Sequence, residues 1–351
     1  MSTPTLKKQK IETTEMSSIK YIITHSGSFH ADEALGVAML RMLPRFQNHQ
    51  LIRSRDPKVW EKADIILDVG AEFDAKLNKF DHHQKSFNEF FYSQPEKQIT
   101  KLSSAGLIYK YFGKEIIQEI LNPIEISDDD MSILYTKIYD DFIEAIDAND
   151  NGVNCYDINA VAKYKNNNLS IPSIVSNLNP NWNDGLDDSP EESAARFDRH
   201  FEIASELVGK IFRQFAFNVG AAWLPAKNKV ISALMERTDD GIIIFESYVA
   251  WKDHLLTAEK EKNLENEIKF VITKESSGSW RVITVPVKQG SFEFRVGLPT
   301  ELRGLRDDDL SKAAGIPDGV FIHASGFIGG AKSKESCLKL ARMGLAESKS
   351  K

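Results

Sequence analysis

The 351-residue chain has only two cysteines, Cys155 and Cys337, which are too few for a disulfide framework and favour a reducing, intracellular compartment. It also lacks any run of about 18 apolar residues, so we expect no membrane span, and its polar first residues argue against a secretory signal. Basic residues are in the minority, with 44 Lys and Arg against 51 Asp and Glu and a net charge of −7. This excludes a protein held to nucleic acid by a uniformly basic surface, so any phosphate group must be bound locally.

The composition is that of a folded protein with more than one domain. Hydrophobic residues make up 42% of the sequence and charged residues 27%, which supplies enough apolar side chains for a large core. Because a typical domain has roughly 150 residues, a chain of this length predicts two domains. We expect a disordered polar tail over 1–18, a first domain over 19–224 and a second domain over 225–351. The three lysines of the tail are typical of a solvated segment, with a weak nuclear signal as the alternative.

Strand-like and helix-like segments alternate in the first domain. Short apolar runs predict strands over 21–24, 51–53, 65–70 and 79–81, and good helix formers predict helices over 33–43, 105–112 and 131–147. Such alternation is typical of an α/β fold with a mostly parallel sheet flanked by helices. Gly113 is expected to end the second helix as a C-cap. A polar stretch over 165–185 predicts an extended loop, and an amphipathic helix is expected after Pro190.

The second domain is expected to be smaller and of the α+β class. Strand signals cover 242–245, 270–273, 280–285 and 292–296, a helix is expected over 251–262, and a glycine-rich segment covers 323–330. The preferred boundary between the two domains is the segment 224–229.

Histidines and aspartates gather near the predicted ends of strands in the first domain. The set comprises His25, His30, Asp32, Asp68, Asp81, His82 and His83. Because the carboxyl ends of parallel strands open onto one crevice, we expect these side chains to lie close together. Taken singly, each residue fits a surface turn or a hydrogen-bonded strand end, but the ordered set favours one shared site.

Several carboxylates in one crevice require a counter-charge. Two carboxylates about 4 Å apart repel each other by roughly 4 kcal/mol at an effective dielectric constant near 20. Carboxylates and neutral imidazoles are ligands of Mn²⁺, Zn²⁺, Co²⁺ and Fe²⁺, and two such ions can hold a phosphoryl group and activate a water molecule. The set therefore predicts a site for divalent metal ions.

The motifs resemble those of the DHH phosphoesterase superfamily. They are HSGSFHADEAL (25–35), LDVG (67–70), FDHHQ (80–84), SSAGLIY (103–109) and AIDANDNG (145–152). More narrowly, these motifs together with VAWKDHL (249–255) and HASGFIGG (323–330) resemble the Myg family, of the melanocyte-proliferating-gene type, over about 19–341. The resemblance implies a metal-dependent hydrolase with a DHH-like fold. More specifically, it implies a 3′→5′ RNA exonuclease of the nucleus or mitochondrion, with the cytoplasm as an alternative compartment.

The resemblance also implies a set of metal ligands. His25 and His30 would hold one ion, Asp32 and His82 the other, and Asp68 would bridge them. His30 stands where the wider superfamily has an aspartate, so the first site is richer in nitrogen than usual. Nitrogen ligands favour Mn²⁺, Co²⁺ or Zn²⁺ over Mg²⁺. We expect two divalent ions, Mn²⁺ first among them, with Co²⁺, Zn²⁺ or Mg²⁺ as alternatives.

Four further residues of these motifs are candidates for the site: His83, Asp81, Asp147 and Asp150. By the same resemblance, His83 would contact the substrate phosphate or move protons, and Asp81 would orient its neighbours. In the fourth motif Asp147 and Asp150 are three residues apart and share one helix face, so either is a candidate for the remaining ligand.

The second domain supplies candidates for substrate binding. The segment containing His323, Ser325 and Gly326 resembles a substrate-binding motif in which glycines let backbone amides approach a phosphate. A turn between packed elements is the alternative. The arginines considered for phosphate are Arg295, Arg303 and Arg306. The aromatic residues considered for base stacking or core packing are Trp251, Trp280 and Phe327.

These observations predict a divalent-metal-dependent phosphodiester hydrolase that acts on the 3′ end of single-stranded RNA. The first alternative is a hydrolase of small phosphate compounds such as pyrophosphate, which the acidic net charge favours. The second is a scaffold that retains a metal site without catalysis. The oligomeric state is left open.

Overall fold

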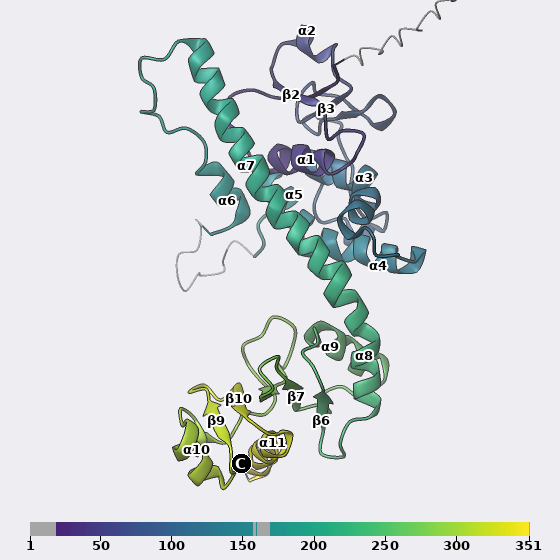
Figure 1. Ribbon diagram of the computed structural model, residues 1–351. Coiled ribbons are helices and arrows are strands. Elements are labelled where there is room, and N and C mark those ends of the chain that lie inside the picture. Colours follow the sequence, from purple (N-terminus) through teal and green to yellow (C-terminus); the bar gives the residue numbers. More distant parts are fainter. Residues whose placement is uncertain (1–18, 157–158, 160–168, 351) are drawn as a thin grey trace, which may run out of the picture. The chain divides into compact units, whose positions relative to one another are not determined.

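The computed structural model describes residues 19–156, 159 and 169–350, so the expected tail over 1–18 lies outside the described residues. The chain divides into two compact units, with the division between Ala216 and Phe217. The segment 224–229, expected at the boundary, is helical and belongs to the second unit. Each unit has its own sheet and core (Figure 1). Within the described residues, no helix has both the length and the apolar character that crossing a bilayer requires.

The first unit is built on a five-stranded sheet in the order β2-β1-β3-β5-β4. The strands are β1 (Tyr21–Thr24), β2 (Gln50–Arg53), β3 (Ile65–Leu67), β4 (Phe73–Asp74) and β5 (Lys79–Phe80). All neighbouring strands are parallel except β4 and β5, which are antiparallel. The expectation of a mostly parallel sheet is confirmed, and only the short edge strand β4 was missing from it.

Helices flank this sheet. They are α1 (Ala31–Arg41), α2 (Pro57–Trp60), α3 (Ser104–Leu121), α4 (Asp128–Ile138), α5 (Glu144–Asp150), α6 (Ile171–Ser176) and α7 (Pro190–Asn218). Single turns of 3₁₀-helix cover Ala75–Leu77 and Pro95–Lys97, and a π-helical turn, Tyr139–Ile143, joins α4 to α5. α1 packs against α3, and at Gly36 of α1 a Cβ atom would lie only 2.6 Å from Leu67. This close packing holds the start of α1 beside the strand ends.

Gly113 does not end a helix, contrary to the C-cap expected from the sequence. α3 continues through it to Leu121. A Cβ atom at this position would lie 2.9 Å from the ring of Tyr135 and 3.0 Å from that of Tyr109. Those two rings stack on each other between α3 and α4, so the glycine provides space for helix packing.

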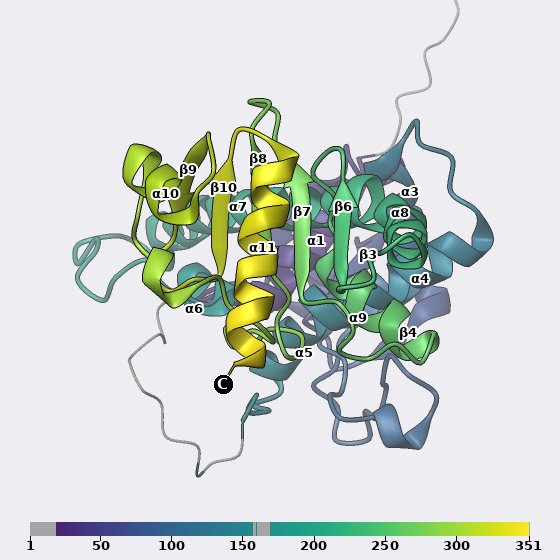
Figure 2. The same cartoon turned by 90° about the horizontal axis from the view of Figure 1, so that it is seen from below.

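The second unit contains a sheet in the order β6-β7-β8-β10-β9. Its strands are β6 (Ile242–Phe245), β7 (Phe270–Lys274), β8 (Trp280–Thr284), β9 (Gly319–Ile322) and β10 (Ile328–Ala331). β6 and β7 are parallel, and the other neighbours are antiparallel. The helical elements are the π-helical turn Val219–Trp223, α8 (Leu224–Met235), α9 (Lys252–Glu261), the 3₁₀ turn Thr300–Leu302, α10 (Asp307–Ala314) and α11 (Lys334–Lys349). α11 lies across β7, β8 and β10 (Figure 2). The α+β expectation is confirmed.

One strand expectation in this unit needs correction. The segment 292–296 forms no strand, and only an isolated bridge joins Phe294 to Pro286. The glycine-rich segment 323–330 divides into a turn at Gly326, where φ is +76°, and the strand β10. The aromatic content of 292–296 favoured a strand, but pairing with neighbouring strands decides which residues form one.

Candidate metal centre in the first unit

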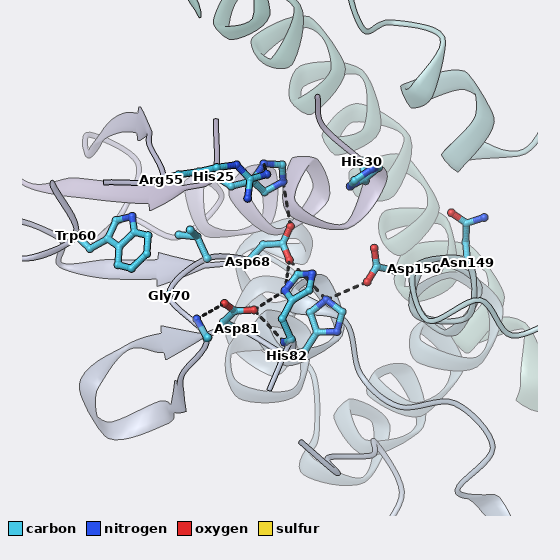
Figure 3. A pocket seen from close by; sticks show the side chains of 13 residues that line it. His25, His30, Arg55, Trp60, Asp68, Gly70, Asp81, His82, Asn149 and Asp150 are labelled. Atoms are coloured by element: carbon cyan, nitrogen blue, oxygen red, sulfur yellow. Dashed lines mark hydrogen bonds and ion pairs between the residues drawn. The ribbon is translucent and has the colours of Figure 1, made fainter. Parts of the chain in front are cut away.

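The carboxyl ends of three parallel strands supply most of the candidate metal centre. His25 follows β1, Asp68 follows β3, and the Asp81–His83 segment follows β5. These residues line an open pocket of about 930 Å³ together with His30 and with Asp150 from α5 (Figure 3). The structure thus brings together side chains from separate stretches of the sequence, as the parallel sheet predicts.

Asp68 lies at the middle of this cluster. Its Oδ2 atom is 3.3 Å from Nε2 of His25, and its Oδ1 atom is 3.5 Å from Nε2 of His82. The same nitrogen of His82 is 2.9 Å from Oδ2 of Asp150. Asp68 also accepts a hydrogen bond from the Ser104 hydroxyl, at 3.2 Å. One carboxylate therefore connects the His25 side of the pocket with the His82 side.

Asp32 carries two buried oxygen atoms that have no hydrogen-bond partner among the residues that the structure describes. The side chain is 1% exposed. Burial, followed by the negative charges of Asp68, Glu33 and Asp150, raises the pKa of Asp32 well above its usual range. A buried carboxylate without a donor is costly, and a cation relieves the desolvation and the repulsion together.

The donor atoms are close enough together to share cations. Four groups of three have ligand atoms within 4.8 Å of one another: His25, His30 and Glu33; Asp68, His82 and His83; His30, Asp32 and Asp150; and Asp32, Glu33 and Asp68. Imidazole nitrogens and carboxylate oxygens are the donors that Mn²⁺, Co²⁺ and Zn²⁺ accept. The residues present therefore fit the divalent ions that the sequence resemblance implies.

Burial and neighbouring carboxylates act in opposite directions on the pKa values of His25 and His82. Burial lowers the pKa of His25, but hydrogen bonds and charge interactions with Asp68 and Glu33 outweigh it and raise the pKa to about 10. Burial likewise lowers the pKa of His82, and Asp150 and Asp68 raise it to about 10. In the opposite direction, the two imidazoles overcome the effect of burial on Asp68 and hold the pKa of that carboxyl below its usual range. Acids and imidazoles are strongly coupled in this cluster.

The loop after β3 adopts a backbone that few residues accept. Asp68 and Ala71 have φ values of +57° and +52°, and Gly70 has +103°. Aspartate tolerates the left-handed region better than most residues, whereas alanine does not. The loop is fixed by a 2.6 Å hydrogen bond from the Ala71 N–H to Oδ2 of Asp81. This backbone conformation directs the Asp68 carboxylate toward the pocket (Figure 3).

Asp81 and His83 form a pair at the open side of the pocket. Nδ1 of His83 lies 2.7 Å from Oδ1 of Asp81, which also accepts the His83 backbone N–H at 3.1 Å. Asp81 raises the pKa of His83, and despite burial these hydrogen bonds lower the pKa of Asp81. The His83 side chain is 60% exposed, so its other ring nitrogen is accessible. This geometry fits the orienting role expected for Asp81.

The two candidates of the fourth motif occupy different environments. Asp150 lines the pocket and contacts His82. Asp147 is completely buried, and its oxygens accept hydrogen bonds from the Ser103 N–H, the Ser103 hydroxyl and the Tyr139 hydroxyl. Burial raises the pKa of Asp147 to about 7 although these donors lower it. Asp147 therefore holds α5 against α3, and Asp150 is the candidate that faces the pocket.

Sequence reasoning missed three residues of this site. Glu33 is fully buried, and its Oε1 is 3.0 Å from Nε2 of His25. Arg55 and Trp60 line the pocket, and a guanidinium nitrogen of Arg55 lies 3.0 Å from Nδ1 of His25. The sequence carries a signal for two of the three: Glu33 adjoins Asp32 in the first motif, and Arg55 follows the carboxyl end of β2.

The candidate substrate residues all lie in the second unit. His323 and Ser325 are exposed and hydrogen-bonded to each other at 2.8 Å, and Gly326 turns the chain between β9 and β10. Arg303 is partly buried, and its Nε donates to the Leu298 carbonyl. Arg306 is exposed and lies over the Phe321 ring.

Arg295 does not offer its charge to a phosphate, which corrects one expectation. Its guanidinium forms two hydrogen bonds with Glu259, at 2.8 and 2.7 Å, and a third with the Ile268 carbonyl. The side chains of Arg295 and Glu259 are 6% and 1% exposed. This buried ion pair joins α9 to the segment 292–296, and the charge of Arg295 is already neutralised.

Comparison with known proteins identifies the family. A family model described as "Uncharacterised protein family (UPF0160)", MYG1_exonuc, matches residues 21–345. The chain belongs to the MYG1 family. The MYG1 protein of Saccharomyces cerevisiae is 51% identical over 335 residues, which cover 93% of this chain and 96% of the yeast protein. The human protein named MYG1 exonuclease is 38% identical over 331 residues, covering 92% of this chain and 85% of the human one.

The family resemblance expected from the motifs is confirmed, and the names of the mammalian MYG1 members agree with the expectation of a hydrolase. Among solved structures, the complex of RecJ with Mn²⁺ from Thermus thermophilus aligns at 11% identity and a TM-score of 0.24, covering 95% of this chain and 52% of that chain. A TM-score this low supports no argument about the present chain.

Proposed function

We propose that this chain is a divalent-metal-dependent phosphodiester hydrolase that removes nucleotides from the 3′ end of single-stranded RNA. The observation that carries the proposal is the convergence of Asp32, Asp68, His82 and Asp150 on one site, with both oxygens of the buried Asp32 lacking a hydrogen-bond donor among the described residues. The name exonuclease, carried by mammalian MYG1 proteins, supports nucleic acid as the substrate.

The proposed ligands are those that the family resemblance implies. His25 and His30 would hold one ion and Asp32 and His82 the other, with Asp68 between them. Asp150 joins the second group because of its contact with His82. When bound, divalent cations neutralise charge on a phosphoryl group and lower the pKa of water. Mn²⁺ is the proposed ion because the site mixes imidazole and carboxylate donors.

The chain's own residues then position the substrate and move a proton. Asp81 accepts from Nδ1 of His83 and so fixes the ring orientation. This leaves Nε2 of His83 accessible to an oxygen of the phosphodiester or of the leaving group. Arg55 is the arginine among the lining residues, and its guanidinium fork matches phosphate oxygens.

The direct test measures the shortening of a 5′-labelled single-stranded RNA by purified protein with Mn²⁺. The Asp68→Asn and His82→Ala variants should lose at least about 100-fold in rate, on the order of 3 kcal/mol of barrier, because each removes a proposed ligand. Asparagine is preferred to alanine at position 68 because it also tolerates the left-handed backbone. Mn²⁺ should also raise the midpoint of thermal unfolding of the wild type and not that of Asp68→Asn.

Two results would contradict the mechanism: wild-type activity in these variants, or unchanged activity in excess chelator. Turnover of pyrophosphate that exceeds turnover of RNA would instead favour a hydrolase of small phosphate compounds, which the net charge of −7 supports. Absence of both bound metal and hydrolysis across a panel of phosphoesters would favour the non-catalytic scaffold.

A further inference from the structure

We propose that the second unit contains a stacking site for an unpaired nucleobase, formed by aromatic residues around the start of α9. The inference rests on the proposed function, since it names how the chain binds its nucleic acid. It concerns a pocket of about 880 Å³ that belongs entirely to the second unit. The aromatic residues that line it are Trp223, Tyr248, Trp251, Phe292, Phe294 and Phe327.

Three of these rings are exposed to solvent at the pocket. Phe292 is fully exposed, Tyr248 is 74% exposed and Phe327 is 41% exposed. Among the residues that the structure describes, neither Tyr248 nor Phe292 makes a ring contact with another aromatic side chain. Exposed aromatic rings with free faces are costly in water, and a nucleobase offers a flat surface that covers them.

Trp251 and the contact of Phe327 with His323 anchor the wall of the pocket. Trp251 is 2% exposed and packs in the core beside Leu255, so it is mainly a core residue. Phe327 contacts the His323 ring edge-to-face, with the ring centroids 4.9 Å apart. The pocket therefore combines a wall anchored in the core with solvent-exposed rings that are free to contact a ligand.

Polar groups accompany these rings, as a nucleobase with hydrogen-bonding edges requires. Gln289, Ser291 and Ser325 line the pocket, together with the acidic Asp253 and Glu293. The Ser325 hydroxyl is hydrogen-bonded to the His323 ring, and the Ser291 hydroxyl accepts the Glu293 N–H. Lys252 also lines it, with Nζ 5.9 Å from the centroid of the Trp251 ring. The edge of a nucleobase supplies a donor and an acceptor for the Gln289 amide.

The charge of the chain favours stacking over phosphate binding as the source of affinity. A net charge of −7 provides no general attraction for a polyanion. Base stacking tolerates any sequence, because every base has a π-face. We therefore expect binding whose dependence on salt is shallow, corresponding to about one or two phosphate contacts.

The test measures binding of a fluorescein-labelled decamer of riboadenylate to the full chain in EDTA, so that no cleavage occurs. The variants are Phe292→Ala and Tyr248→Ala, which change exposed side chains. Trp182→Ala is the matched control, because Trp182 is 88% exposed and does not line the pocket. Each pocket variant should weaken binding about ten-fold, and the control should bind as the wild type does.

A decamer with abasic residues at its 3′ end provides the second measurement and should bind about ten-fold more weakly than the intact decamer. Equal binding of intact and abasic decamers, or wild-type affinity in both pocket variants, would overturn the stacking site. Competition by an apolar peptide but not by adenosine monophosphate would assign the pocket to a protein partner and overturn it as well. These binding measurements require no metal, whereas the hydrolysis assay requires Mn²⁺. A failure of the stacking site and a failure of the proposed hydrolase function can therefore be told apart.

Discussion

Asp68 shows how one residue connects the chemistry of the candidate metal centre with its backbone. Its carboxylate reaches toward both His25 and His82, and its φ of +57° is one that few side chains accept. The sequence pattern predicts Asp68 at a strand end, and the family resemblance implies a bridging role for it. Only the folded loop, held by Ala71 and Asp81, gives the carboxylate this direction.

The two aspartates of the fourth motif should differ in their effect on metal binding. Asp150→Asn should reduce the Mn²⁺ bound per chain or weaken its affinity about ten-fold or more, because it removes an anionic donor that faces the pocket. Asp147→Asn should leave Mn²⁺ binding close to that of the wild type, because both carboxylate oxygens already accept internal hydrogen bonds. Isothermal titration with Mn²⁺ measures both. Equal losses in the two variants would count against the assignment.

Asp147 should also make folding stability depend on pH. Its pKa is raised from 3.8 to about 7 in the folded chain, so the folded state holds this proton more tightly than the unfolded state. The contribution of Asp147 to the free energy of unfolding is therefore fully present below about pH 4. It is lost as the pH rises through about 7, a change on the order of 4 kcal/mol. Asparagine at position 147 cannot titrate. Urea unfolding gives the difference in free energy of unfolding between the wild type and Asp147→Asn. This difference should decrease as the pH is raised from about 4 to about 8, and a constant difference would contradict the prediction.

Elements of secondary structure were predicted well where the local pattern and the packing agree. The strands at 21–24 and 242–245 are short β-branched runs, and both form as expected. The helix from Pro190 follows its amphipathic pattern and continues to Asn218. The prediction was wrong where an element depends on a neighbour far along the chain, as for Gly113 inside α3 and for the segment 292–296, which forms only an isolated bridge.

Gly113 gives a direct test of that explanation. If it were a C-cap, alanine would be mildly unfavourable; within a helix, alanine improves intrinsic propensity by about 1 kcal/mol. The structure predicts a net loss of about 1–2 kcal/mol for Gly113→Ala, because the added methyl group contacts the rings of Tyr109 and Tyr135. Gln118→Ala, at an exposed position of the same helix, is the control. Urea unfolding should show the loss only for Gly113→Ala, and a stabilised variant would refute the packing role.

At the scale of the whole molecule, the chain consists of two units with separate sheets and separate functions proposed for them. The first unit collects acids and histidines at the carboxyl ends of parallel strands. The second has a mostly antiparallel sheet and an aromatic pocket. The predicted boundary lies a short distance beyond the observed one, and it falls within a helix. The proposed nuclear or mitochondrial compartment remains a prediction from the family resemblance.

The sequence by itself determined the family, the α/β class of the first unit and the residue types of the candidate metal centre. Motifs and hydrophobic periodicity depend only on residues that are close together in the sequence. Tertiary structure decided which of Asp147 and Asp150 faces the pocket, that Glu33 and Arg55 join the site, and that Arg295 is neutralised by Glu259. The physical reason is that burial, hydrogen-bond partners and charge neutralisation depend on residues distant in sequence. Local sequence patterns identify candidate residues, and the tertiary contacts of each side chain decide whether it can bind a ligand.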